Sequence, residues 1–128
     1  MELTSMEHEI VRNILKSEQY SNTKYSKQMP YLVVKLREYT GVGAYVHFAL
    51  QEEGYQFVEK TLRDFTLSID KIITLPQLKD GLEFILEASD GKIDYLEIFT
   101  FGDEHWDGKE EGFLIIDIGD VVGTSDAT

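Results

Sequence analysis

Residues 82–101 read LEFILEASDGKIDYLEIFTF, and this stretch decides the fold. Apolar and polar side chains alternate over residues 82–88 and 93–101, and Asp90-Gly91 lies between the two runs. A period of two is typical of strands, and Asp-Gly supplies the two residues of positive φ that a tight type I′ turn requires. The period of residues 76–88 would also fit a helix, but the turn favours strands. The stretch therefore predicts a β-hairpin.

A second hairpin is predicted earlier in the chain. Residues 31–39 and 44–51 alternate and are rich in Val, Tyr and Phe, and Thr40-Gly-Val-Gly43 between them can turn because its glycines can take positive φ. Alternation gives this hairpin one basic and aromatic face and one apolar face. The first face comprises Lys35, Arg37, Tyr39, Tyr45, His47 and Gln51. The second comprises Leu32, Val34, Leu36, Val46, Phe48 and Leu50.

The remaining segments predict one helix and further strands. Thr4 and Glu7 form a capping box, and an apolar stripe follows at helical spacing. We expect a loop over 20–30, a strand or loop over 55–62, a strand over 65–69, a loop over 102–112 and a well-buried strand over 113–118. The sum is a single α+β domain over residues 1–118, in which the N-terminal helix packs on an antiparallel sheet of about five to seven strands built from hairpins. Residues 119–128 are expected to be a frayed tail.

The composition of the chain limits the cellular compartments in which we expect it. The chain of 128 residues holds no cysteine, which excludes disulfides, Cys-ligated zinc and thiol catalysis. Its N-terminus has no basic region followed by an apolar run, and no stretch approaches the roughly 18 apolar residues that a membrane span needs. We expect a cytoplasmic protein that does not bind membranes.

The distribution of charge along the chain limits the kinds of partner that we expect. All of the formal net charge of −12 lies in residues 80–128, which hold fourteen acidic and two basic side chains. Such a surface suits a basic protein partner or a hard cation, and it repels nucleic-acid backbones and anionic membranes. We therefore expect no nucleic-acid partner, and we interpret the basic and aromatic face of the second hairpin as a solvated surface.

The acidic loop over 102–112 is the first candidate site. Carboxylates on one loop are what Ca²⁺ or Mg²⁺ requires, but an EF-hand alignment that starts at Asp103 places Leu114 where the bidentate Glu belongs. We therefore favour neither a metal nor a cofactor, and the metal-ligand candidates would be Asp103, His105 and Asp107. Trp106 is the only Trp, and it is expected to close the core unless it is exposed as a binding anchor. The candidate partner-binding residues are Asp103, Glu104, Trp106, Asp107, Glu110 and Glu111.

Glu97 is the second candidate. If strand 93–101 alternates regularly, Glu97 shares one side with Ile93 and interrupts an aromatic row formed by Tyr95, Phe99 and Phe101. A carboxylate in this position is hydrogen-bonded by a buried partner, solvated at a sheet edge, or held in a pocket with a raised pKa that would serve acid–base chemistry. The structural interpretations are favoured, and Glu97 is the candidate catalytic residue of the alternative.

Two segments also resemble a family of short, uncharacterised bacterial proteins. They are the T-G-V-G turn at 40–43 with the aromatic strand after it, and the segment LEIFTFGDEHW at 96–106, which has the pattern L-E-x-F-T-F-G-D-E-x-W. Ala44 stands where the family usually has an aromatic residue, and His105 separates the acidic pair from Trp106. The resemblance implies the hairpins and a bacterial cytoplasmic origin, and it implies no activity.

These observations favour a non-enzymatic interaction protein whose acidic C-terminal half binds a basic protein partner, as an inhibitor or an immunity-like protein would. The alternative is a small-molecule or divalent-metal-dependent enzyme that uses Glu97 and the loop from Asp103 to Asp107. A third possibility is a homo-oligomer that assembles through a free strand edge.

Overall fold

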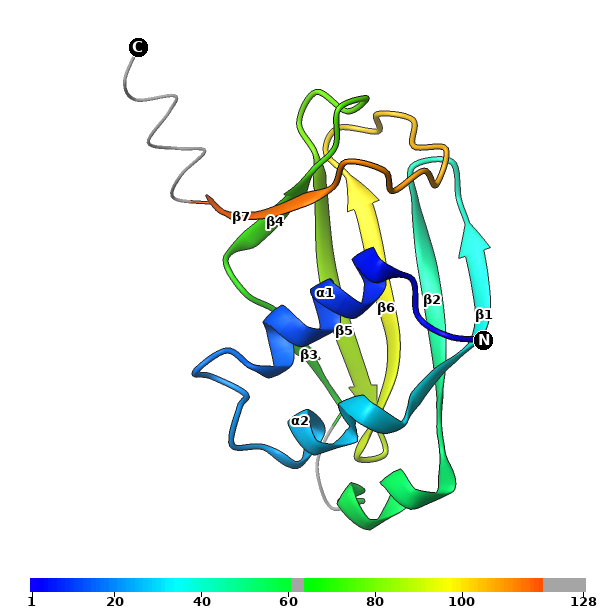
Figure 1. Cartoon of the computed structure of the whole chain (residues 1–128), viewed down its shortest axis with the longest axis vertical. Helices are drawn as coiled ribbons and strands as arrows, with labels where there is room; N and C mark the ends of the chain where they lie inside the picture. The colour runs from blue at the N-terminus through cyan, green and yellow to red at the C-terminus, as the bar shows by residue number, and fades with distance from the viewer. Residues whose placement is uncertain (61–63, 119–128) are drawn as a thin grey trace.

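One antiparallel sheet organises the chain, and both α-helices lie on the same face of it (Figure 1). The computed structural model describes residues 1–60 and 64–118, so the tail expected at 119–128 lies outside the described residues. The strands are β1 (Leu32–Tyr39), β2 (Gly43–Leu50), β3 (Phe65–Leu67), β4 (Lys71–Thr74), β5 (Leu82–Ser89), β6 (Lys92–Thr100) and β7 (Leu114–Asp117). They lie in the order β1-β2-β6-β5-β4-β7, and β3 pairs with β5.

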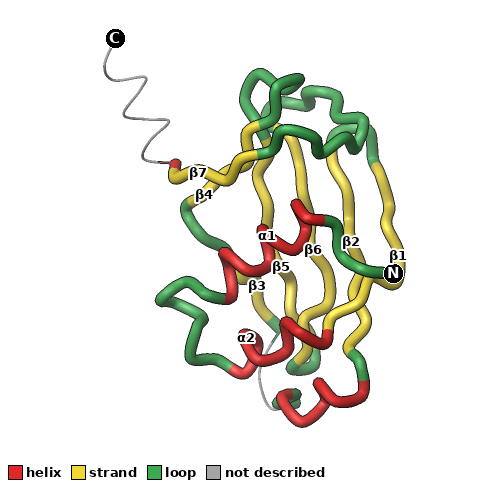
Figure 2. The backbone as a smooth tube through the Cα atoms, in the orientation of Figure 1, coloured by secondary structure: helices red, strands yellow, loops and turns green. Residues whose placement is uncertain are grey.

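The helices are short. They are α1 (Ser5–Leu15), α2 (Lys24–Gln28) and the 3-10 helices η1 (Met29–Tyr31) and η2 (Glu52–Phe57), which Figure 2 separates by colour from the strands. None of the described helices has the length and apolar character that crossing a membrane would require. The predicted α+β class, an N-terminal helix on an antiparallel sheet of up to seven strands, is confirmed.

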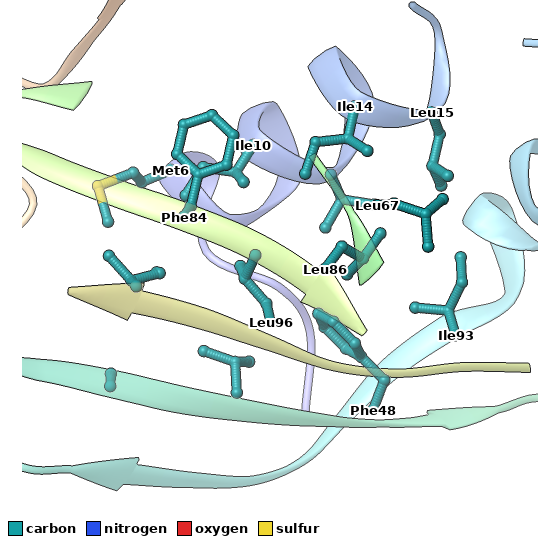
Figure 3. Close-up of a cluster of buried hydrophobic side chains, with 14 of the residues drawn as sticks. Met6, Ile10, Ile14, Leu15, Phe48, Leu67, Phe84, Leu86, Ile93 and Leu96 are labelled. Carbon is teal, nitrogen blue, oxygen red and sulfur yellow. The ribbon is translucent and has the colours of Figure 1, made fainter. Parts of the chain in front are cut away.

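Helix α1 begins at the predicted capping box. The Glu7 N–H donates to Thr4 Oγ1 over 3.1 Å, and the Thr4 N–H donates to Glu7 Oε1 over 2.9 Å. The apolar stripe of α1 is fully buried against the inner face of the sheet (Figure 3), and each such side chain contributes about 1.5–3 kcal/mol of hydrophobic free energy. The core cluster includes Met6, Ile10, Val11, Ile14 and Leu15 of the helix with Phe84, Leu86 and Leu96 of the sheet.

Both predicted hairpins are present. Asp90 and Gly91 have φ values of 54° and 77°, as a type I′ turn requires, and β5 and β6 pair on either side of them. In the β1–β2 turn only Gly41 has positive φ, at 90°. Gly43 is the first residue of β2, and a Cβ there would lie 2.1 Å from the Ile98 carbonyl oxygen. Gly43 is therefore required by the close approach of β2 and β6.

Residues 20–30, predicted as a loop, contain α2 and the start of η1. Gln28 is fully buried, and its amide Nε2 donates to the Gly91 and Phe57 carbonyl oxygens over 2.9 and 3.1 Å. Its Oε1 accepts from the Ile93 N–H over 3.1 Å. These partners lie far away in sequence, so no local periodicity could indicate this helix. Residues 52–57 likewise form η2, and residues 61 and 62 of the segment predicted as strand or loop lie outside the described residues.

The last strand differs from its prediction. Segment 113–118 was expected to be well buried, but β7 is an edge strand whose Leu114 is 63% exposed. Its neighbour β4 was missed, because four residues carry too short an alternation to predict a strand. Strands β4 and β7 are far apart in the sequence and pair in antiparallel register, with Ile72 opposite Ile116 and Lys71 opposite Asp117.

Two β-bulges reverse the expected faces of the strands. The register passes from Val34↔Phe48 to Leu36↔His47, which leaves Lys35 without a partner. An extra residue turns every later side chain to the opposite face. Leu36, expected in the apolar face, is therefore 50% exposed, and Arg37, expected outside, turns to the helix side. The register in the β5–β6 hairpin likewise skips Asp94, which puts Ile93 in the core and not beside Glu97.

Candidate functional site

The sheet face opposite the α-helices is a candidate surface, and we call it the open face. Its side chains are intermediate or exposed, and between the two bulges and the Phe101 end of the sheet they include glutamates and aromatic rings but neither Lys nor Arg. The open face comprises Leu36, Glu38, Tyr45, His47, Glu83, Ile85, Glu87, Tyr95, Glu97, Phe99 and Phe101.

Three rings meet at the centre of the open face. The Tyr45 and Tyr95 rings meet edge to face with centroids 5.9 Å apart, and the His47 ring lies 5.7 Å from Tyr95 and 6.4 Å from Tyr45. The register explains the cluster, because Tyr45 and His47 lie two residues apart on β2 and Tyr95 is the cross-strand partner of His47. At these separations the rings touch one another, so they form a platform and enclose no cage.

Carboxylates flank this platform. Glu38 Oε1 lies 2.6 Å from His47 Nε2, and Glu97 is the cross-strand partner of Tyr45. The charge of Glu97 and its hydrogen bond with the Tyr45 hydroxyl raise the pKa of Tyr45 above its usual value. Burial, followed by the charges of Glu87 and Glu97, raises the pKa of Tyr95. Both tyrosines therefore stay protonated at neutral pH and present neutral hydroxyls among negative charges.

The acidic loop is largely occupied by contacts within the chain. Both carboxylate oxygens of Glu104 accept from the Lys79 N–H, over 2.9 and 3.2 Å, and Asp107 Oδ1 accepts from the Lys109 N–H over 3.0 Å. Trp106 is 3% exposed, and its indole N–H donates to the Lys109 carbonyl oxygen over 3.0 Å. Trp106 therefore closes the core, as its structural interpretation expected, and its ring is not exposed to a partner.

Glu110 is also turned inward. It lies over the N-terminus of α1, where its carboxylate accepts hydrogen bonds from the Thr4 side chain and the Met6 backbone. Burial raises its pKa nonetheless, and the nearby charge of Glu7 raises it further, while Arg37 lowers it. A carboxylate at a helix N-terminus compensates the partial positive charge of the helix, so Glu110 holds the loop against α1.

Apart from glycines, the exposed residues of the loop are Asp103, His105, Asp107, Lys109 and Glu111. Within residues 1–60 and 64–118, no group of three or more His, Asp or Glu side chains is placed to hold a metal ion. Asp103, His105 and Asp107 are thus not brought together. Glu97 lies on the open face five residues before Gly102, which is about 17 Å of extended chain from the start of the loop. The structure does not combine Glu97 with the loop.

Sequence reasoning found Glu97 but missed the residues around it. His47 and Tyr45 were assigned to a solvated face of the hairpin over residues 31–51, and the bulge at Lys35 replaces Arg37 by Glu38 on that face. The face is therefore more acidic than alternation predicts. The three-ring platform forms because β2 and β6 pair closely. In the sequence, Gly43 is the residue that indicates this close approach of the two strands.

Searches of protein-family models, curated proteins and solved structures find no match to this chain. The resemblance to short bacterial proteins therefore stays a prediction.

Proposed function

We propose that this chain is a non-enzymatic interaction protein that binds a basic protein partner through the open face. The observation that carries the proposal is the combination of four glutamates with a platform of aromatic rings on the open face, where the described residues between the two bulges and Phe101 include neither Lys nor Arg. Carboxylates attract cationic side chains over distance, and aromatic faces bind them at short range. An inhibitor or immunity-like protein of the bacterial cytoplasm that covers a cationic surface is the concrete version.

We place the proposed binding surface on the sheet and not on the loop. Glu104, Asp107 and Glu110 each accept hydrogen bonds from their own chain, and Trp106 is buried. The carboxylates of Glu104 and Glu110 are only partly exposed, and the loop over 102–112 offers a partner no aromatic ring beside them. On the open face, Glu87 accepts from Thr66 over 2.6 Å and Glu97 pairs with Tyr45, and both remain partly accessible.

A second copy of this chain is a poorer occupant of the open face. Pairing two open faces would bring glutamates opposite glutamates, and like charges that meet across an interface oppose association by several kcal/mol.

Strand edges are also partly protected. The Met1 backbone exchanges two hydrogen bonds with Val34 on β1, and the adjacent bulge at Lys35 distorts this edge.

The test is binding of a fluorescent peptide of nine arginines, measured by anisotropy at low salt. We expect the double variant Glu87→Gln/Glu97→Gln to bind about tenfold more weakly, because it removes two charges from the open face. The matched control is Asp103→Asn/Glu111→Gln, which removes two exposed loop charges and should change affinity less than about twofold. Both variants should melt at the wild-type temperature.

Equal losses in the two double variants would overturn the proposal, because they would show that only the net charge matters. Sedimentation of the wild-type protein gives an independent check. A homodimer that the open-face variant disrupts would replace the basic partner by a second copy of the chain. A natural basic partner retained in a native mass spectrum at low salt should be released by the open-face variant and kept by the loop variant.

A further inference from the structure

A hollow lies at the Phe101 end of the open face. It is lined by Ile72, Asp80, Glu83, Phe101 and Ile118. Ile73 points into the core opposite Leu82, so Ile72 turns outward and gives the hollow an apolar wall. Ile118, which is 36% exposed, contributes a second aliphatic surface.

Both charged residues of the hollow are negative. Among the described residues neither Asp80 nor Glu83 has an ion-pair partner, whereas Lys71, one residue before Ile72, is already paired with Asp117 over 2.8 Å. Glu83 is half-buried on β5, next to Phe99 across the strands. A half-buried carboxylate beside apolar groups is incompletely solvated, so a cation that binds there displaces little water.

We propose that this hollow receives one arginine side chain of the basic partner, an inference that rests on the proposed function. The methylene groups of an arginine match Ile72 and Ile118, and its planar guanidinium can lie over the Phe101 ring while it donates to Asp80 and Glu83. Lysine fits less well, because its ammonium is more strongly hydrated and cannot bind a carboxylate with two parallel donors. One arginine in a pocket beside a charged sheet is the usual form of an interface hot spot.

The test compares peptides of nine arginines and nine lysines on the same protein. We expect the wild type to bind the arginine peptide about fivefold more tightly, from the stacking on Phe101 and the paired hydrogen bonds. Phe101→Leu keeps the hollow apolar and removes the aromatic ring, so it should reduce this preference and leave only the part that comes from the paired hydrogen bonds. Glu83→Gln should weaken binding of the arginine peptide about tenfold and binding of the lysine peptide by a smaller factor.

The matched control is Glu87→Gln, which removes one charge from the open face outside the hollow and should weaken both peptides by the same factor. A second measurement needs no variant. In a protein with ¹³C-labelled isoleucine methyl groups, the arginine peptide should shift the Ile72 and Ile118 signals, and the Ile10 signal of the core should stay unchanged.

Two failures are distinguishable. If neither peptide binds at low salt, the proposed function fails. If both peptides bind equally well, or if the preference for arginine is undiminished in Phe101→Leu, the hollow is not an arginine site although the open face still binds basic segments. Unchanged Ile72 and Ile118 signals at saturation would lead to the same conclusion.

Discussion

Arg37 donates two hydrogen bonds to the carboxylate of Glu7, from Nε to Oε2 over 2.8 Å and from Nη2 to Oε1 over 2.7 Å. The side chain of Glu7 is 2% exposed and that of Arg37 is 18% exposed. Because Glu7 also accepts from the Thr4 N–H, this pair joins the start of α1 to β1. It exists because the bulge at Lys35 turns Arg37 to the helix side of the sheet.

Removing one member of this pair should be costly. We expect Arg37→Met to lower the free energy of unfolding by about 3 kcal/mol, because it leaves the buried charge of Glu7 unpaired. The double variant Glu7→Gln/Arg37→Met should lose less, since it leaves no charge behind. Urea denaturation at pH 7 measures both. As a control, Lys71→Met, which breaks an exposed pair with Asp117, should cost less than about 1 kcal/mol.

Glu110 should make stability depend on pH. Its raised pKa in the folded state means that the folded protein binds this proton more tightly than the unfolded chain does. The contribution of Glu110 to stability therefore falls as the pH rises from the usual carboxyl value through the raised one. Glu110→Gln carries no such charge, so it should gain stability relative to the wild type as the pH rises from about 4 to about 7.

Urea denaturation across this pH range tests the expectation. The neighbouring variant Glu111→Gln is the control, because Glu111 is exposed and should show no comparable change. A stability difference between Glu110→Gln and the wild type that stays constant from acidic to neutral pH would contradict the assignment.

Gly91 should tolerate no side chain. Its φ is 77°, and a Cβ would lie 2.3 Å from the Glu59 carbonyl oxygen. We expect Gly91→Ala to cost about 2–4 kcal/mol, because backbone strain adds to a clash with rigid main chain. Gly102 has φ of 59° with nothing within 4 Å, so Gly102→Ala should cost only about 1 kcal/mol. Thermal unfolding of the two variants separates the effects, and equal losses would show that the approach of Glu59 does not matter.

Gln28 should contribute more to the stability of the fold than is usual for a polar side chain. Gln28→Ala would leave the Gly91 and Phe57 carbonyl groups and the Ile93 N–H without their partner, and we expect a loss of about 3 kcal/mol. Amide hydrogen exchange should accelerate at Ile93. Gln56→Ala is the control, because the exposed Gln56 amide bonds only the nearby Glu53 carbonyl group and should contribute less than about 0.5 kcal/mol. Unchanged exchange at Ile93 would refute the assignment.

The parts of the fold that depend on neighbouring residues were predictable. The capping box at Thr4 and the Asp90-Gly91 turn are local, since each is decided by side chains within four residues of one another. The helix stripe and most of the β5–β6 hairpin arise from regular periodicity, which the bulge at Asp94 interrupts only next to the turn. These features determine the α+β class and the antiparallel sheet. The acidic excess of residues 80–128 was equally readable, and it directs attention to a cationic partner.

The arrangement of the candidate site depended on the tertiary structure. The single extra residues at Lys35 and Asp94 are accommodated as bulges only because β1 and β6 must match their partner strands, and each bulge exchanges the two faces of the strand residues beyond it. The loop carboxylates looked free in the sequence but accept hydrogen bonds from distant backbone groups. The sequence by itself thus determined which elements form and how much charge they carry, because those are local properties. Only the tertiary structure decided which charges face the same surface, because register and burial depend on contacts between residues that are far apart in the chain.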